Sequence, residues 1–285
     1  MSKKIAVTTE SSADISKALQ KELDIHVIPM TVLICDEEFK DGVDLTAKEL
    51  YEKSELYNEI PKTAGISPHD YKLVFETLTQ QGFDVVHVSI SGKISSCFQN
   101  ALFASNSFEN VFVVDSLNLS AGMAMLVYEA CRLRDSGKSA MEIAAELEKL
   151  RLKISTSFLL EDTGFLCRGG RCSKAEQLTA DLFSLRPSVE VVGGKLLPGK
   201  RYRGRGLEAP KKYIVRTLEE KKADKGMCLL NHSGLKENEV EELVSFVRKS
   251  YPFEKIVSNE AGCCISSHCG RGCVGIIFKE QSSAD

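Results

Sequence analysis

The sequence lacks any apolar run long enough to cross a membrane, and its first residues lack the apolar core of a secretory signal. Two lysines near the start are followed by the polar stretch Thr8-Thr9-Glu10 instead of the roughly 7–15 apolar residues of a signal peptide. No later segment reaches the ~18 consecutive apolar residues of a transmembrane helix. These absences predict a soluble cytoplasmic protein with no integral membrane span.

A strong net charge is also missing. The chain has 37 Lys and Arg residues against 40 Asp and Glu residues, a formal charge of −3, and a pI near 6.1. Such a chain has no general attraction to nucleic acids, so we expect no nucleic-acid partner. The one basic run that includes an aromatic residue, Lys200 to Arg205, is typical of a solvated loop, with contact to a partner as the alternative.

Several catalytic and cofactor motifs are absent or out of context. The chain has no G-x-x-x-x-G-K-[ST] phosphate loop and no G-x-S-x-G nucleophile elbow. The segment 270–275 fits G-x-G-x-x-G, but a β-like run follows it where a dinucleotide site requires a helix. We therefore predict no cofactor.

The ten cysteines have no paired C-x-x-C spacing, and the adjacent Cys263-Cys264 suit a tetrahedral metal site poorly. In a reducing cytoplasm most of them are expected to be free thiols that pack as small apolar residues. We therefore predict no metal. An alternative is a redox-sensitive site in which Cys167 or Cys172 approaches Cys269.

The chain does have enough apolar residues for a full core, with 43% hydrophobic content over 285 residues. Strands and helices alternate in its first half, which is typical of a parallel sheet. Strands are predicted at 4–8, 85–90 and 111–114, and helices from about residue 15 (capped within 10–14), then at 97–107, 120–136 and 140–154. Capping signals at Thr46 to Glu49 and at Ser67-Pro68 predict two more helix starts.

A second unit is predicted to begin near residue 155. Its elements are strands at 155–160, 227–230 and 274–278, helices at 174–185, 209–221 and 237–250, and a hairpin that turns at Gly193-Gly194 between 189–192 and 195–197. The predicted fold class is therefore α/β, with a parallel-sheet domain at 1–155 and a second α/β domain at 156–285.

Hydroxyl groups gather where the strands of the first half end, which is where ligands bind in open parallel sheets. This hydroxyl cluster consists of Thr8, Thr9, Ser11, Ser12, Ser91, Ser95, Ser96 and Ser116, with Asp115 beside it. It offers neutral donors to a ligand. The alternative is that these residues are ordinary caps and turn residues.

Several separated motifs resemble those of the DegV family of fatty-acid-binding proteins, in the same order along nearly the whole chain. The segment 5–15 resembles the opening V-T-D-S-T-A-D-L, 41–44 matches D-G-V-D, and 61–67 is similar to P-x-T-S-Q-P-S. The segment 90–101 resembles I-S-S-x-L-S-G-T-Y-Q-S-A, Gly169-Gly170-Arg171 matches G-G-R, and 268–272 is similar to H-x-G-P-G.

The resemblance implies a carrier of a long-chain fatty acid, which is held between the two domains. It implies that Thr63 and Ser95 bind the fatty acid carboxylate, and that Arg171 and His268 lie at the mouth of the site. Family members act as carrier subunits of a bacterial fatty acid kinase, whose separate catalytic subunit forms an acyl phosphate for phospholipid synthesis. On this basis the protein is expected to be a lipid-binding carrier subunit and not an enzyme.

The chain departs from the family pattern near these residues. It has Ser96-Cys97 where the family has G-T, Ala64-Gly65-Ile66 where the family has S-Q-P, and Arg271 in place of a proline. A cation at Arg271 would strengthen an anion site near His268 or contact a partner.

Two other functions remain open from the sequence alone. One is a serine hydrolase of acyl esters that uses Ser95 or Ser96 with His268 and Asp115. The other is a lipid-sensing regulator, which would have the same pocket as a carrier.

Overall fold

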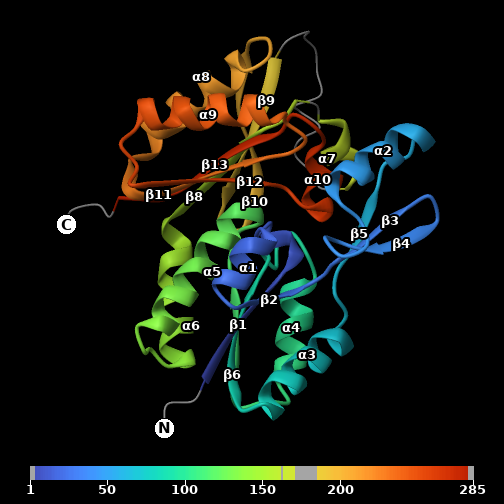
Figure 1. Cartoon of the computed structure of the whole chain (residues 1–285), viewed down its shortest axis with the longest axis vertical. Helices are drawn as coiled ribbons and strands as arrows, with labels where there is room; N and C mark the ends of the chain where they lie inside the picture. Colours follow the sequence, from blue (N-terminus) through green and yellow to red (C-terminus); the bar gives the residue numbers. More distant parts are fainter. Residues whose placement is uncertain (1–3, 162, 171–184, 282–285) are drawn as a thin grey trace.

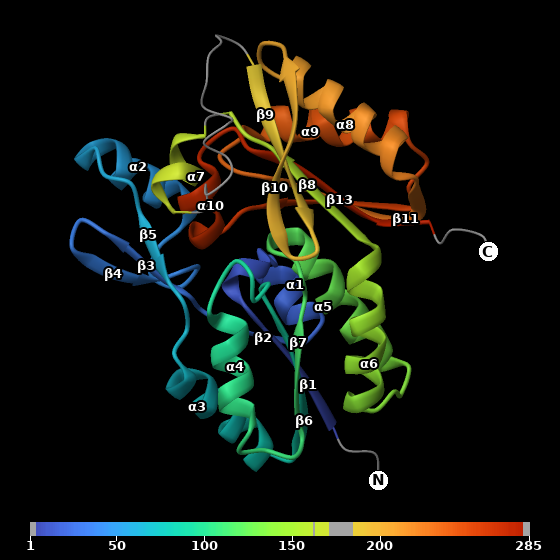
Figure 2. The same ribbon diagram turned by 180° about the vertical axis from the view of Figure 1, so that it is seen from behind.

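The computed structural model describes residues 4–161, 163–170 and 185–281. Two large sheets lie one above the other, and the long helix α5 lies between them (Figure 1, Figure 2). None of the helices in these ranges is long and apolar enough to span a membrane.

The first sheet is parallel throughout and has the strand order β2-β1-β6-β7. Its strands are β1 (Lys4–Glu10), β2 (Ile25–Ile28), β6 (Phe83–Ser89) and β7 (Val111–Asp115). Helices α5 (Ser120–Asp135) and α6 (Ala140–Leu150) pack on one face, while α3 (Pro68–Gln80) and α4 (Cys97–Ser105) pack on the other. The parallel sheet predicted from the alternating pattern is confirmed.

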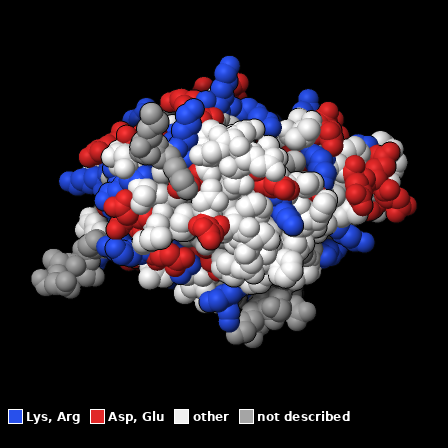
Figure 3. Space-filling view, turned by 90° about the horizontal axis from the view of Figure 1, so that it is seen from below, with Lys and Arg blue, Asp and Glu red and all other residues white. Residues whose placement is uncertain are grey.

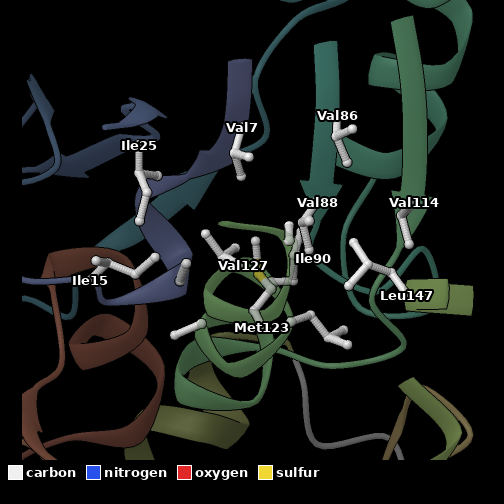
Figure 4. Close-up of a cluster of buried hydrophobic side chains, with 14 of the residues drawn as sticks. Val7, Ile15, Ile25, Val86, Val88, Ile90, Val114, Met123, Val127 and Leu147 are labelled. Carbon is white, nitrogen blue, oxygen red and sulfur yellow. The ribbon is translucent and has the colours of Figure 1, made fainter. Parts of the chain in front are cut away.

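Branched aliphatic side chains on the strands form the core of this layer. Val7, Val86, Val88 and Val114 are completely buried, and Figure 4 shows strand side chains directed toward Met123 and Val127 of α5. Burying a side chain of this size contributes roughly 1.5–3 kcal/mol. The apolar strand runs that predicted the sheet therefore also supply its packing.

Helix starts follow the local capping signals in two of three cases. Thr46 and Glu49 form a complete capping box on α2 (Ala47–Tyr57), and Ser67 caps α3 by accepting from the N–H of Asp70. The predicted cap of the first helix is wrong. Glu10 ends β1 and residues 11–13 form the 3-10 turn η1 (Ser11–Ala13), so Ser16 is the residue that caps α1 (Lys17–Glu22).

The second sheet has the strand order β10-β9-β8-β13-β11-β12, and among these strands only β11 and β12 pair in parallel. Its strands are β8 (Ile154–Leu159), β9 (Leu185–Val192), β10 (Lys195–Arg203), β11 (Ala223–His232), β12 (Lys255–Glu260) and β13 (Val274–Glu280). The short turn η2 (Arg151–Lys153) connects α6 to β8.

Helices α8 (Glu208–Lys221) and α9 (Glu237–Ser250) cover the outer face of this sheet, and α5 meets its inner face. The predicted hairpin at Gly193-Gly194 is confirmed and is longer than expected. Residues 174–184 of the predicted helix 174–185 lie outside the described residues, and Leu185 belongs to β9. The division into domains at residue 155 stays a prediction.

Most of the basic run at 200–205 is a strand and not the loop that its composition indicates, while its arginines are exposed to solvent as that composition predicts. Lys200 to Arg203 belong to β10, where the ring of Tyr202 is buried against Tyr213, with 5.6 Å between the ring centroids. Lys200 pairs with Glu220 of α8. These contacts anchor the run to the second sheet.

A small antiparallel sheet projects from the side of the molecule next to α2 (Figure 1). It consists of β3 (Thr31–Ile34), β4 (Glu37–Lys40) and β5 (Lys62–Ala64), in the order β4-β3-β5. Sequence analysis named none of these strands. One of them, β5, contains the predicted site residue Thr63.

Acidic side chains gather at the end of the molecule that α2 and the β3–β4 hairpin form (Figure 3). Exposed members of this group are Asp36, Glu37, Glu38, Glu52 and Glu55. A concentration of negative charge repels nucleic-acid phosphates. This end of the molecule is therefore unsuited to binding DNA or RNA.

Candidate functional site

A cavity lies between the two large sheets, at the carboxyl ends of the parallel strands. It contains about 850 Å³ of empty space, a volume that includes open solvent at its mouth. Its walls come from the second sheet, from residues that follow strands of the first sheet, such as Met30 and Ile90, from the start of α5 and from α10 (Cys263–Cys269). Apolar side chains dominate the walls, among them Met30, Ile90, Leu119, Phe158, Ile265 and Ile277.

Two of the predicted site residues meet directly at this cavity. Thr63 of β5 and His268 of α10 both line it, and Thr63 Oγ1 lies 2.9 Å from His268 Nε2. If the Nε2–H of His268 donates this bond, the hydroxyl hydrogen of Thr63 stays available for a ligand. The two residues are 205 positions apart in the chain.

Ser95 lines the same cavity and lies just before α4. Its Oγ accepts a hydrogen bond from the backbone N–H of Cys97 at 3.3 Å. A hydroxyl that accepts one bond can still donate another, so Ser95 also offers a hydrogen to a ligand. The structure therefore brings Thr63, Ser95 and His268 to one cavity.

Two departures from the family pattern lie against each other beside Ser95. A Cβ atom added at Gly65 would lie 2.8 Å from Ser96 Oγ, which is too close for both atoms to stay in place. The family pattern has glutamine at position 65 and glycine at position 96, whereas this chain has glycine at position 65 and serine at position 96. In this chain the absence of a side chain at Gly65 therefore leaves room for the hydroxyl of Ser96 beside Ser95.

The helix that contains His268 is held by two acidic residues that sequence analysis did not assign to the site. Asp41 accepts from the backbone N–H groups of Cys263 and Cys264, at 2.7 and 3.2 Å. Asp14 accepts from the N–H of Gly262 at 2.8 Å. Carboxylates favour the start of a helix because unpaired N–H groups point outward there. Both residues fall in segments that match the family motifs, which was the only signal for them.

The glycine-rich G-G-R segment approaches His268. A Cβ atom added at Gly169 would lie 2.4 Å from His268 Nδ1, so only glycine permits this contact. Arg171 lies outside the described residues, and its role stays a prediction.

Arg271 does not supply a cation to the site near His268. Its guanidinium lies over the ring of Tyr51, 4.5 Å from the centroid, and its Nε is 3.1 Å from Glu55 Oε1. Both partners belong to α2. The residue that replaces the family proline therefore connects the α10–β13 loop to α2.

Most residues of the hydroxyl cluster have structural roles, in agreement with the alternative that they are ordinary cap and turn residues. Of its members only Ser95 lines the cavity. Thr9 donates to the carbonyl of Val88, and Ser91 donates to the carbonyl of Gly194. Thr8 Oγ1 lies 2.9 Å from Nδ1 of the buried His87. Ending a strand with a hydroxyl residue is thus a poor guide to ligand contact in this chain.

The serine hydrolase arrangement is not assembled. His268 Nε2 is bonded to Thr63, while Asp115 Oδ1 accepts from the backbone N–H groups of Leu117 at 2.9 Å and Gly92 at 3.4 Å. A catalytic triad requires the histidine to contact both the serine and the carboxylate. The hydrolase alternative has no support from this geometry.

Two of the cysteines near the site pack as apolar residues, whereas Cys167 is disulfide-bonded and is not the free thiol that was expected. Cys269 and Cys273 have free thiols and share a small buried cluster with Leu160 and Leu166, against which Cys167 packs. Cys172 lies outside the described residues. Within the described ranges, no three His, Cys, Asp or Glu side chains are grouped so that they could hold a metal ion.

The fold and the site together define a two-layered α/β protein that encloses an apolar cavity with hydroxyl donors at one end. The family described as "Uncharacterised protein, DegV family" matches residues 4–281. The chain belongs to the DegV family. A DegV domain-containing protein of Clostridium acetobutylicum is 27% identical over 282 residues, which cover 98% of this chain and 99% of the relative.

Solved structures share the same fold. A DegV family protein from Thermus thermophilus, described for its fatty acid binding, is 29% identical with a TM-score of 0.88 and covers 98% of this chain and 100% of its own. The Fatty Acid Kinase B3 protein of Streptococcus pneumoniae, loaded with linoleic acid, is 20% identical with a TM-score of 0.85 and the same coverage. The second likeness is one of fold alone.

Proposed function

We propose that the protein binds a long-chain fatty acid in the cavity and presents it to the catalytic subunit of a fatty acid kinase. The acyl chain lies along the apolar walls, and Thr63 and Ser95 bind the carboxylate. The observation that carries this proposal is the combination of a largely apolar cavity with the Thr63–His268 pair and Ser95 on its wall. The two units at 1–155 and 156–285 act as the two domains that hold the ligand between them.

The acyl chain supplies the attraction in this proposal. Burial of one methylene group contributes about 0.8 kcal/mol, so a sixteen-carbon chain gains on the order of 10 kcal/mol before the entropy of association is subtracted. The carboxylate contributes specificity. It loses water on binding and needs donors in return, which the hydroxyls of Thr63 and Ser95 provide.

The accessibility of the polar residues suits presentation to a partner. Thr63 and Ser95 are only partly buried, whereas the apolar walls at Leu119, Cys264 and Ile277 are buried. A kinase would therefore reach the carboxylate while the chain stays covered. The chain lacks a phosphate loop of its own, and its family resemblance implies a separate kinase. In this proposal Arg171 and His268 contact the acyl phosphate.

Mass spectrometry of the purified protein tests the binding step. We expect a fatty acid, released by organic solvent, at close to one molecule per chain. The double variant T63V/S95A should lose most of it, while Thr217→Val, which changes a buried threonine of α8 away from the cavity, should retain it. No released lipid and no uptake of added palmitate or oleate would overturn the proposal.

A second assay tests presentation. The loaded protein is mixed with ATP and the catalytic subunit of a bacterial fatty acid kinase, and acyl phosphate is measured. We expect formation to depend on the protein and to fall in Arg171→Ala while the bound fatty acid stays the same. If a loaded protein gives no acyl phosphate with any such subunit, the sensor alternative is favoured over the carrier.

A further inference from the structure

Three buried oxygen atoms near the start of α5 have no hydrogen-bond partner within the described ranges. They are Thr156 Oγ1 of β8, Asn231 Oδ1 of β11 and Asn118 Oδ1 of the loop before α5. These residues are 5%, 7% and 2% exposed. Thr156 and Asn231 line the cavity. Unpaired buried polar atoms are rare in folded proteins and need an explanation.

Two of the three atoms lie against the first turn of α5, and the third belongs to a side chain that is hydrogen-bonded to this turn. A Cβ atom added at Gly122 would lie 2.4 Å from Thr156 Oγ1 and 2.5 Å from Asn118 Oδ1, so these two oxygens approach the same point on the helix. Asn231 reaches the same turn from the other strand, because its Nδ2 donates to Ser120 Oγ at 2.7 Å. Glycine at position 122 is what leaves room for this arrangement.

The orientation of both amides is fixed by their other bonds. Asn231 Nδ2 also donates to Asp14 Oδ2 at 3.1 Å, and Asn118 Nδ2 donates to the carbonyl of Ser116 at 3.2 Å. Each amide therefore directs its oxygen away from these partners. Ser120 itself has φ 52°, in the left-handed region that non-glycine residues rarely adopt, and the backbone is held there next to the cavity.

The group has more acceptors than donors. The two amide oxygens only accept, and Thr156 is the one hydroxyl among the three. A plain methylene chain that passes this wall would leave all three atoms unpaired. A ligand hydroxyl would donate to an amide oxygen and accept from Thr156, whereas a ketone could only accept.

We propose that this wall of the cavity binds a hydroxyl group on the acyl chain, so that the ligands of the protein include hydroxylated long-chain fatty acids. The inference rests on the proposed function, because it needs an acyl chain in the cavity. In this inference Thr156 and Asn231 determine which acyl chains bind, because both line the cavity. Asn118 does not line the cavity, but its oxygen lies close to the same point on α5 as that of Thr156.

The test compares stearic acid with a series of hydroxystearic acids that carry the hydroxyl at successive carbons. Dissociation constants are measured by displacement of a fluorescent fatty acid. We expect one position at which the hydroxy acid binds at least as tightly as stearic acid. Thr156→Val should weaken that isomer about tenfold relative to stearic acid, the size of one lost hydrogen bond to a buried partner. Thr156→Ser should restore the ratio, and the keto acid of the same position should bind less well.

The outcomes separate this inference from the function on which it rests. If stearic acid itself fails to bind, the proposed function is wrong. If stearic acid binds but every hydroxy isomer binds more weakly, and Thr156→Val leaves their ratios unchanged, the inference alone is overturned and the three oxygens bind only ordered water. Thr217→Val controls for the loss of a buried threonine hydroxyl elsewhere.

Discussion

Two buried carboxyl groups near the end of β1 show opposite behaviour. Glu10 accepts from Tyr71, Ser89, His87 and the backbone N–H of Ile90, at 2.6–3.1 Å. Burial would raise the pKa of Glu10, but the electrostatic interaction with His87 and the hydrogen bonds from His87, Ser89 and Tyr71 outweigh it and lower the pKa. Glu10 is therefore an ionised group inside the core.

Asp14, four residues later, lies at the junction between the sheets. Burial raises the pKa of Asp14 to about 8, and the nearby Asp41 adds to this effect against the donors Ser120, Gly262 and Asn231. Among the described residues, no histidine, lysine or arginine is one of the main causes of this shift. The comparison shows that hydrogen-bond donors alone do not keep the pKa of the buried Asp14 low. Hydrogen-bond donors together with a histidine do so for Glu10. Glu10 stabilises the first sheet, and Asp14 links α5, α10 and β11 beside the cavity.

The largest expected effect comes from Glu10→Ala. Removing the carboxylate leaves four buried donors without their acceptor, so the free energy of unfolding should fall by about 3–5 kcal/mol. Urea denaturation at pH 7 measures this. A loss below about 1 kcal/mol would mean that the cluster is not stabilised by its charge.

Lowering the pH should also show the contribution of Glu10 to stability. The pKa of Glu10 is lower in the folded state than its ordinary value of 4.5, so its stabilising contribution is present above pH 4.5 and is lost as the pH falls through the folded value. Urea midpoints between pH 7 and pH 3 should fall more steeply in the wild type than in Glu10→Gln. Parallel profiles would contradict the assignment.

Asp14 should show the opposite pH dependence. Its folded pKa of about 8 is above its ordinary value of 3.8, so the folded state holds the proton more tightly. The stability that protonated Asp14 contributes to the folded state is fully present below pH 3.8 and is lost as the pH rises through 8. Asp14→Asn should remove this slope while changing stability at pH 7 by about 1 kcal/mol or less, because the amide also is neutral and retains an acceptor oxygen. A large loss at pH 7 would show that Asp14 is ionised there.

The smallest expected effect is that of Asp41→Asn on the pKa of Asp14. Asp41→Asn removes the like charge beside Asp14 and should lower the pKa of Asp14 below about 8. A carbon-13 NMR titration of labelled aspartate would follow the carboxyl directly. An unchanged or higher pKa would leave burial as the sole cause of the shift.

The parallel sheet was predictable because its strands are continuous apolar runs and its helices start at local caps such as Thr46 and Ser67. The small sheet was not predictable, since β3, β4 and β5 are three or four residues long and, among the described strands, β5 pairs with β3 alone. Helix α10 was also missed, because its first N–H groups bond to Asp14 and Asp41 from distant segments. No local pattern records such contacts.

The candidate site divides in the same way. Thr63, Ser95 and His268 were named from the family resemblance, and nothing in their local sequence brings residues 205 positions apart into contact. Arg271 was interpreted from its charge, but the ring of Tyr51 and the carboxylate of Glu55 determine where it lies. The unpaired oxygens of Thr156 and Asn231 could not be predicted either, because they come together only when β8 and β11 pack against α5.

The position of β13 has a consequence for how the protein is made. This strand comes last among the described strands, yet it lies in the interior of the second sheet between β8 and β11. A nascent chain that is still attached to the ribosome before residue 280 cannot complete that sheet. The cavity wall that β13 shares with β8 and β11 therefore forms only after residue 280 has been synthesised, so a polypeptide released before β13 would lack this wall of the cavity.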